Sequence, residues 1–549
     1  MRREYWFLLG VAAVFLILRL PGTSLPLHQD EYKWPLIVNP ATAGTTSIPH
    51  PPLGEFIYRE AGSMIGFNGH FRFVPLAFSF ANLFLLWYWL RRRAGDNAAL
   101  IGAALFSVSY FSILASLMVD TDGAILPFFL LLALIGYEQA RTDSRWWAAV
   151  LAACLLGFLV KASFILAIGA IAADMLWERR ALLMTREAMR YLAIGFGVVL
   201  ALIVALVVAS RIFPFFDLAN SIRYWEHFAS PHHNWFQVAI QVVKGTLYLS
   251  PFLVLVPLWA ERADVERVRP LVFFTIFGLL FYLIIFDFST GALDRYLQFL
   301  IVSLISLSAV VLARFAEAPQ RPDYRLIAIG SIVAIAVFAL QFLPHAVPPL
   351  YPKSAWLGRI ASMHWTFLYP FSGGSGPLTF YVSFLFLALS WFGSAALIAA
   401  GFWRRQWRVA LLTLLLPLSI GYTAAFIEEY LVGGINGSAA VLVDRAAAFI
   451  AADPDIQHVV VYNDNGGYEI QQTGKYAKRL YTSPDFDVTQ KAATMNAFKG
   501  HYLVIDAPPI DPMSIFAKYF ATCIPIYRDA DGAIHVTIYD CRTAPVIVL

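Results

Sequence analysis

Charged residues are scarce in this sequence. They make up 14% of its 549 residues, whereas soluble globular proteins contain about 25%. The net charge of +4 is small for so long a chain, which argues against a nucleic-acid-binding protein. Hydrophobic residues reach 59% and the mean hydropathy is +0.65, which excludes a soluble enzyme and a disordered protein. The composition predicts a protein that spans a membrane many times.

Cysteine is also rare, which excludes a disulfide-rich scaffold. Cys154 lies in an apolar run and is expected to pack inertly. Cys523 and Cys541 flank two predicted strands joined at Asp531-Gly532, a strong hairpin signal. Such a hairpin brings the two cysteines nearly opposite each other, where either a disulfide or two unpaired thiols would fit. A disulfide would place this end of the chain in an oxidising compartment.

Long apolar runs recur along most of the chain. A helix needs about 20 apolar residues to cross the hydrocarbon core. The first run follows Arg2 and Arg3, as in a signal peptide, but no small-residue cleavage site comes after it, so we expect a retained anchor. The runs predict about thirteen transmembrane helices, at residues 5–20, 73–90, 98–118, 123–138, 146–160, 162–178, 191–212, 237–259, 270–287, 295–313, 325–343, 377–402 and 408–427.

Arginine is concentrated in alternate loops between these runs. Cytoplasmic loops of membrane proteins are enriched in Lys and Arg. The bias therefore predicts a multi-pass protein of the inner (cytoplasmic) membrane with a cytoplasmic N-terminus, and an odd number of spans puts the C-terminal tail outside. The arginines that carry this bias are Arg91, Arg92, Arg93, Arg141, Arg145, Arg179, Arg180, Arg186, Arg190, Arg262, Arg267, Arg269, Arg314, Arg321, Arg325, Arg404, Arg405 and Arg408.

Two domains follow from this pattern. Residues 1–429 are predicted to form the transmembrane domain, which includes a long first outer loop at 21–71. That loop and the outer loops 213–236 and 344–376 mix Pro, Trp and aromatic residues, which favours short helices along the membrane surface. Residues 430–549 are predicted to form a small α/β extracytoplasmic domain. Its expected strands are 458–463 and 501–506, and its expected helices are 438–452 and 512–521.

Several carboxylates lie on the predicted outer face, close to the ends of apolar helices. Asp30 and Glu31 follow the first span within an aromatic, apolar stretch, where adjacent carboxylates are costly unless they have a role. The alternative is a solvated pair in a loop. Asp120 and Asp122 lie between the third and fourth spans. Asp122 would otherwise cap the following helix.

Three cations occupy the same predicted face. Lys161 interrupts an otherwise uncharged run, Arg295 precedes Tyr296 at the start of the tenth span, and Arg72 begins the second span. A lysine or arginine within reach of lipid can bind a phosphate. Each could instead extend along the membrane interface as an anchor. Their shared location with the carboxylates favours a common site.

These residues resemble motifs of membrane glycosyltransferases of the GT-C superfamily that use polyprenyl-phosphate sugars. The relatives are the protein O-mannosyltransferases and the bacterial lipid A aminoarabinose transferases. The resemblance covers roughly residues 1–320, in order, and excludes the tail. The similar motifs are the Asp30-Glu31 pair, the HPPLG run at His50–Gly54, GFNGHFRFVP with Arg72, VDTDG with Asp122, VKAS with Lys161, and DRY with Arg295 and Tyr296.

The resemblance implies an inverting transfer of a hexosyl or pentosyl group from a lipid phosphate. A phosphate leaves with little protonation, so one base suffices, and we assign it to Asp30. Glu31 would orient substrate, hold a cation or face water. Lys161, Arg295, Tyr296 and Arg72 would bind the donor phosphate. Asp122, Asp120 and His50 would bind substrate.

No cofactor is expected to be required. The alternative is a divalent metal held by His50, His232, His233 and Glu31, although His232 and His233 are adjacent and cannot share one helix face. The expected partners are a polyprenyl-phosphate-linked sugar, a glycan, glycolipid or protein acceptor, and membrane lipid, but no nucleic acid. The competing functions are a transporter or flippase of a lipid-linked glycan, and a structural assembly protein. The motif set favours an enzyme. A cell-envelope glycan is the favoured acceptor, because the tail does not resemble the domain that protein mannosyltransferases use.

Overall fold

The computed structural model describes most of the chain and divides it by internal contacts into two compact units. The first unit comprises Met1–Thr23 and Lys33–Arg321, and the second comprises Ser24–Tyr32 and Pro322–Leu549. The predicted domain boundary at residue 430 separates a membrane-spanning part from an outer part, whereas these two units are defined by contacts between residues. That boundary therefore stays a prediction. The described residues are 3–39, 42, 48–66, 71–180, 187–229, 233–286, 293–317, 323–349, 352–371, 378–463, 465–480 and 488–547.

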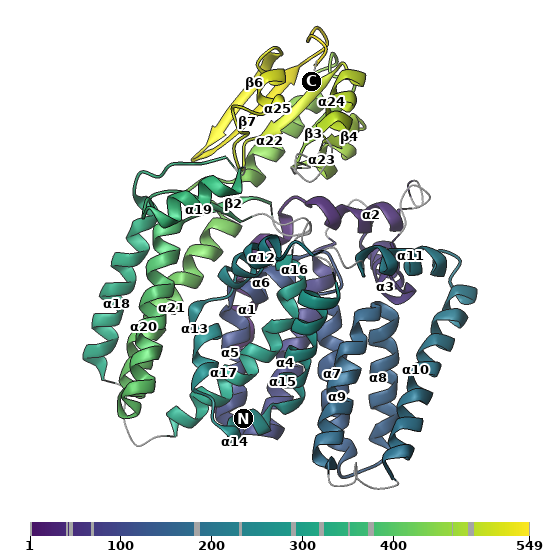
Figure 1. The fold of residues 1–549 in the computed structure, drawn as a ribbon, viewed down its shortest axis with the longest axis vertical. Coiled ribbons are helices and arrows are strands. Elements are labelled where there is room, and N and C mark those ends of the chain that lie inside the picture. Colours follow the sequence, from purple (N-terminus) through teal and green to yellow (C-terminus); the bar gives the residue numbers. More distant parts are fainter. Residues whose placement is uncertain are drawn as a thin grey trace. The chain divides into compact units, whose positions relative to one another are not determined.

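Helices make up the regular structure described in the first unit. α7, α8 and α9 pack against one another, and α17 packs on α5 (Figure 1). The helices are α1 (Arg3–Ile17), α2 (Lys33–Val38), α3 (Pro52–Ile65), α4 (Phe73–Ala94), α5 (Asp96–Val108), α6 (Tyr110–Leu117), α7 (Ile125–Ala140), α8 (Trp146–Val160), α9 (Ile165–Glu178), α10 (Glu187–Ile212), α11 (Leu218–Phe228), α12 (Trp235–Leu247), α13 (Pro251–Leu255), α14 (Arg262–Arg267), α15 (Arg269–Leu280), α16 (Leu293–Tyr296) and α17 (Leu300–Ala316).

A helix occupies each predicted transmembrane range, but the count of thirteen spans is not confirmed. Among the described residues, seven helices are long and apolar enough to cross a membrane, or up to nine if each of two bent pairs is one span. α7, α8 and the helix at Arg269–Ile285 are apolar but shorter. The apolar runs that predicted the spans are continuous in the sequence, whereas the helices that form within them end early or bend.

The two bent pairs show why an apolar run need not be one straight helix. α5 and α6 meet at Ser109 with a bend of 64°. The segment Trp235–Leu247 meets Pro251–Trp259 at 111°. In the second case Pro251 starts a new helix and Ser250 caps it, because its hydroxyl accepts from the Leu253 N–H.

The described part of the second unit contains three long helices and two small sheets. α18 (Tyr324–Phe338), α20 (Phe384–Trp403) and α21 (Arg408–Leu431) pack together (Figure 1). β1 (Leu368–Phe371) pairs antiparallel with β2 (Phe380–Ser383). This pair corrects two predictions: the loop 344–376 holds a strand besides the helix α19 (Lys353–Ala361), and the predicted span at 377–402 begins with a strand. Strands of four residues are too short to give a clear sequence pattern.

The C-terminal residues form the predicted α/β domain. Its five-stranded sheet has the order β4-β3-β5-β7-β6, in which β3 runs parallel to β4 and β5 while β7 runs antiparallel to β5 and β6. β3 and β5 confirm the two expected strands. The elements are α22 (Ala439–Ala452), β3 (Val459–Tyr462), α23 (Gly467–Gln472), β4 (Tyr476–Leu480), α24 (Val488–Ala497), β5 (His501–Ile505), α25 (Ile515–Phe520), β6 (Ile524–Asp531) and β7 (Ile534–Asp540).

Alternate residues of each strand face opposite sides of this sheet. Val459, Val461 and Leu503 join a buried cluster with α22, while Val460 and Tyr502 join another with α24 and α25. Both faces of the sheet are therefore covered, which explains why the strands read as continuous apolar runs.

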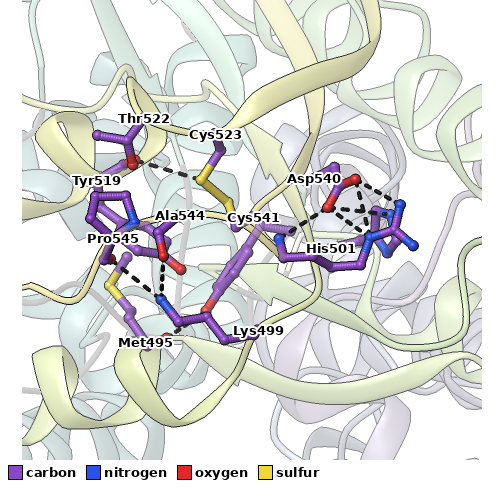
Figure 2. The surroundings of a disulfide bond; sticks show 12 residues. Met495, Lys499, His501, Tyr519, Thr522, Cys523, Asp540, Cys541, Ala544 and Pro545 are labelled. Atoms are coloured by element: carbon purple, nitrogen blue, oxygen red, sulfur yellow. Dashed lines mark hydrogen bonds and ion pairs between the residues drawn. A yellow bond between two sulfur atoms is a disulfide. The ribbon is translucent and has the colours of Figure 1, made fainter.

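The predicted hairpin and its disulfide are present. β6 and β7 pair antiparallel across the turn at Asp531-Gly532, and Cys523 is bonded to Cys541 (Figure 2). Close to the bond, Lys499 donates to the carbonyl of Ala544 at 2.8 Å. The sequence left open whether Cys523 and Cys541 form a disulfide or remain thiols, and the structure contains the disulfide. The bond links the end of β7 to the start of β6.

Candidate active site

A buried ion pair joins two segments that are far apart in the sequence. Lys161 follows the last residue of α8, and its Nζ lies 2.8 and 2.6 Å from the two carboxylate oxygens of Asp122, which precedes α7. Both side chains are buried, and a buried charge is stable only when it is paired. Burial alone would lower the pKa of Lys161, but the Asp122 carboxylate outweighs it and raises that pKa. Lys161 is therefore a fixed cation.

A second ion pair lies beside the first. The guanidinium of Arg295, in α16, lies 3.0 Å from Asp120. Burial would raise the pKa of Asp120, but the charges of Arg295 and Lys161 hold it below its ordinary value. Tyr296 links the pairs: its hydroxyl accepts from Arg295 at 2.6 Å, and its ring centroid lies 5.0 Å from the Lys161 Nζ. The structure thus brings two predicted cations, two predicted carboxylates and Tyr296 into one cluster.

His50 belongs to the same cluster. Burial and the charge of Lys161 lower the pKa of His50 to about 3, so its ring is neutral at physiological pH. Tyr224 contacts the ring edge-on with centroids 5.6 Å apart. The neutral ring of His50 can therefore donate a hydrogen bond to a substrate or accept one from it, but it adds no charge to the site.

The HPPLG run fixes the entry to α3 against this cluster. Pro52 is the first residue of α3, where its missing N–H costs nothing. A Cβ placed on Gly54 would lie 3.0 Å from the Cγ2 of Thr121 and 3.5 Å from the carbonyl oxygen of Val160. These neighbours directly adjoin Asp120, Asp122 and Lys161. Glycine at this position lets α3 pack onto both segments that hold the ion pairs.

We expect Gly54→Leu to disable the site without unfolding the protein. The added side chain must push on Thr121 and Val160, and overpacking of this kind costs about 1–3 kcal/mol. Sugar transfer should fall by about 5- to 160-fold, which is that energy range expressed as a change in rate, measured with purified protein and a polyprenyl-phosphate sugar. Gly358→Leu in α19 is the matched control, because a Cβ there meets nothing within 4 Å. Equal effects of both substitutions would contradict this account.

Two buried arginines hold α6, the helix that leads into Asp120. Arg72 donates to the carbonyl of Leu117, the last residue of α6, at 2.5 Å. Arg19, which is 0% exposed, donates to the carbonyls of Phe106 and Ser107 at 3.1 and 2.8 Å, at the end of α5. The last carbonyls of a helix lack partners within it, so Arg19 stabilises the break between α5 and α6. The proposed contact of Arg72 with phosphate stays a prediction.

Sequence analysis missed Arg19, because an arginine near the end of an apolar run resembles an interface anchor. The signal that could have marked it is its location on the predicted outer side, against the arginine bias. We expect Arg19→Met to destabilise the protein by several kcal/mol, since each buried group left unpaired costs about 1–3 kcal/mol. Thermal unfolding in detergent measures this effect. Arg262→Met is the control, because its side chain is 85% exposed and should change stability by less than about 0.5 kcal/mol.

The two remaining acidic candidates lie in the second unit. Glu31 is buried, and its Oε2 accepts from the backbone N–H of His28 at 2.9 Å. This bond closes the turn Gln29–Tyr32. Asp30, in the same turn, is partly exposed. The meeting of Asp30 with the cations of the first unit stays a prediction.

An apolar cavity adjoins the ion pairs. It contains about 480 Å³ of free space, including the part open to solvent. Its polar groups come from Asp122, Ser163, Tyr282 and Tyr296, and the rest of the wall is apolar. Mostly apolar cavities with a few polar groups are typical ligand sites. The lining residues are Asp122, Leu126, Pro127, Leu130, Ser163, Phe164, Leu166, Phe274, Tyr282, Tyr296, Phe299 and Val302.

The metal alternative gains no support from the part of the chain that the structure describes, where no three His, Cys, Asp or Glu residues gather as a metal site. His232 lies outside the described residues. The Nε2 of His233 lies 3.2 Å from the carbonyl oxygen of Phe286, and its ring stacks on Trp235 with centroids 5.0 Å apart. His233 thus has partners other than a metal.

Comparisons with known proteins bear on the fold and the family. Residues 49–209 match the family model described as dolichyl-phosphate-mannose-protein mannosyltransferase. The structure is similar to ArnT from Cupriavidus metallidurans in the apo state, with 15% identity, 99% of each chain covered and a TM-score of 0.56. The same protein bound to undecaprenyl phosphate gives 16% identity, 97% coverage of each chain and a TM-score of 0.55. No curated protein matched the chain. The predicted fold class is confirmed.

Proposed function

We propose that the chain is a membrane glycosyltransferase of the GT-C superfamily, which transfers a sugar from a polyprenyl-phosphate donor to a cell-envelope glycan or glycolipid. The observation that carries this proposal is the pair of ion-paired cations, buried Lys161 and largely buried Arg295, which both contact Tyr296 next to an apolar cavity. A lipid phosphate needs both features: cations for its head group and an apolar surface for its chain. The solved ArnT structure with undecaprenyl phosphate makes this donor class the natural one to test.

Each charged group has a distinct role in this proposal. The planar guanidinium of Arg295 can bind two phosphate oxygens at once, whereas the Lys161 ammonium acts as a point charge. Asp120 and Asp122 hold these cations in place through contacts of 2.6–3.0 Å. Because all four groups are fixed before the reaction, they need little reorganisation as negative charge builds up on the departing phosphate.

The proposed reaction is a single displacement. An acceptor hydroxyl or amine attacks the anomeric carbon, and the bond from that carbon to the phosphate oxygen breaks. The lipid phosphate leaves with the bonding electrons, and Asp30 takes the acceptor proton. Attack opposite the leaving group inverts the anomeric configuration. No metal ion takes part, so activity should survive treatment with a chelator.

The location of the reaction is proposed from the loops and the tail. The arginine bias puts the N-terminus in the cytoplasm and the carboxylates and cations on the outer face of the inner membrane. The bond between Cys523 and Cys541 fits an oxidising extracytoplasmic compartment. A protein acceptor is the second candidate, since the matching family model describes a protein mannosyltransferase.

A transfer assay tests the proposal. Purified protein is incubated with a panel of hexose-, pentose- and amino-sugar polyprenyl phosphates, with lipid A, envelope glycans or a peptide as acceptor. At least one donor should yield free polyprenyl phosphate together with a glycosylated acceptor of inverted configuration. Loss of activity in a chelator would overturn the metal-free mechanism. Movement of an intact lipid-linked glycan across vesicles, with no bond broken, would overturn the proposal itself.

A further inference from the structure

The segment that carries Asp30 packs with the C-terminal domain. Ser24–Tyr32, here called the acidic segment, belongs to the second unit, whereas the chain on both sides of it belongs to the first. Its immediate neighbours are α23 and the end of β3, elements that follow it by more than 400 residues in the sequence. The domain that sequence analysis left without a role therefore contacts the proposed base segment.

Polar contacts lie on both sides of Asp30. The backbone N–H of Leu27 donates to the Oε1 of Glu469, in α23, at 3.1 Å. The side chain of Gln29 donates to the carbonyl of Asn463 at 3.4 Å. After Asp30, the ring of Tyr32 stacks on Tyr468 with centroids 6.5 Å apart. The acidic segment is thus held before and after the carboxylate.

The backbone at one of these contacts is unusual on both sides. Gln29 has a φ of 46° and Asn463 a φ of 54°. Non-glycine residues rarely adopt positive φ, and surrounding contacts must hold them there. The turn that presents Asp30 therefore depends on its packing against the C-terminal domain as well as on its local sequence.

We infer that Glu469 is a positioning residue for Asp30, so that the C-terminal domain sets the geometry of the base. This inference rests on the proposed function. A base must lie within hydrogen-bonding reach of the acceptor proton, and a shift of about 1 Å can cost about 10²-fold in rate. Glu469 acts on the backbone of Leu27, three residues before Asp30. It does not touch the donor, so its loss should reduce kcat more than donor affinity.

Two substitutions at Glu469 separate positioning from charge. Glu469→Ala removes the acceptor for Leu27, and we expect kcat to fall at least about tenfold with the KM for the donor nearly unchanged. Glu469→Gln keeps a side-chain oxygen that can accept the same bond, and should restore most of the rate. Hydrogen–deuterium exchange of the peptide covering residues 25–32 should rise in Glu469→Ala and stay near wild type in Glu469→Gln.

Asn496→Ala is the matched control in the same domain. It removes two hydrogen bonds to Ile547, of 2.7 and 2.9 Å, that do not involve the acidic segment. It should change neither kcat nor the exchange of residues 25–32. If Asn496→Ala lowers kcat as much as Glu469→Ala does, the effect is general loosening of the domain and the inference is wrong.

The exchange measurement does not depend on sugar transfer, so it separates this inference from the proposed function. Unchanged exchange in Glu469→Ala would overturn the inference even if the enzyme transfers sugar. Raised exchange with an unchanged kcat would also overturn it, because the contact would then have no effect on the base. If no polyprenyl-phosphate sugar is a substrate, the proposed function fails, and raised exchange would still support the hold of the C-terminal domain on the acidic segment.

Discussion

Lys161→Ala is expected both to abolish sugar transfer and to destabilise the protein. The Lys161 ammonium and the Asp122 carboxylate are buried and in direct contact. Removing one partner of a buried pair costs about 3–5 kcal/mol, because the other charge is left uncompensated. The same substitution removes the point charge proposed to bind the donor phosphate. Thermal unfolding in detergent measures the first effect, and binding of polyprenyl phosphate measures the second.

A double substitution separates these two effects. Lys161→Met combined with Asp122→Leu replaces the ion pair by apolar side chains, which often restores or increases stability. We therefore expect the double variant to unfold near the wild-type temperature while it still fails to bind the phosphate. Wild-type phosphate binding by this variant would refute the role of Lys161. A double variant as unstable as Lys161→Ala would show that the pair is needed for more than charge compensation.

Several members of the ion-pair cluster could be singled out from the sequence, but their pairing could not. Lys161 and Arg295 stood out because a charge within an apolar run is costly. Nothing in the sequence indicates that Lys161 pairs with Asp122 while Arg295 pairs with Asp120, since the partners come from separate segments. The bonds of Arg19 across the α5–α6 break were equally hidden, because the break itself has no sequence signal stronger than Ser109.

The fold, too, could be predicted from the sequence only in part. The apolar runs predicted where helices form, because a helix that is buried in lipid or protein needs apolar side chains. The Asp531-Gly532 turn predicted the β6–β7 hairpin. The lengths of the spans were less predictable, since bends such as the one before Pro251 depend on local capping. The packing of the acidic segment on α23 depends on residues more than 400 positions apart, for which one sequence gives no pattern.

Asp30→Asn is expected to cause a large loss of activity with little change in structure. The amide has nearly the same size as the carboxylate but cannot take up the acceptor proton. General-base catalysis contributes about 10²–10⁴-fold, so kcat should fall by that factor. Donor binding should stay nearly intact, because the proposed phosphate site lies on Lys161 and Arg295. Single-turnover transfer and equilibrium binding of the donor, measured on the same preparation, distinguish the two quantities.

Glu31→Gln provides the comparison from the neighbouring position. Glu31 is buried and its Oε2 accepts from the His28 N–H, and a glutamine oxygen can accept the same bond. Its loss of activity should therefore be smaller than that of Asp30→Asn. Transfer by Asp30→Asn at the wild-type rate, or a larger defect in Glu31→Gln, would move the base away from Asp30.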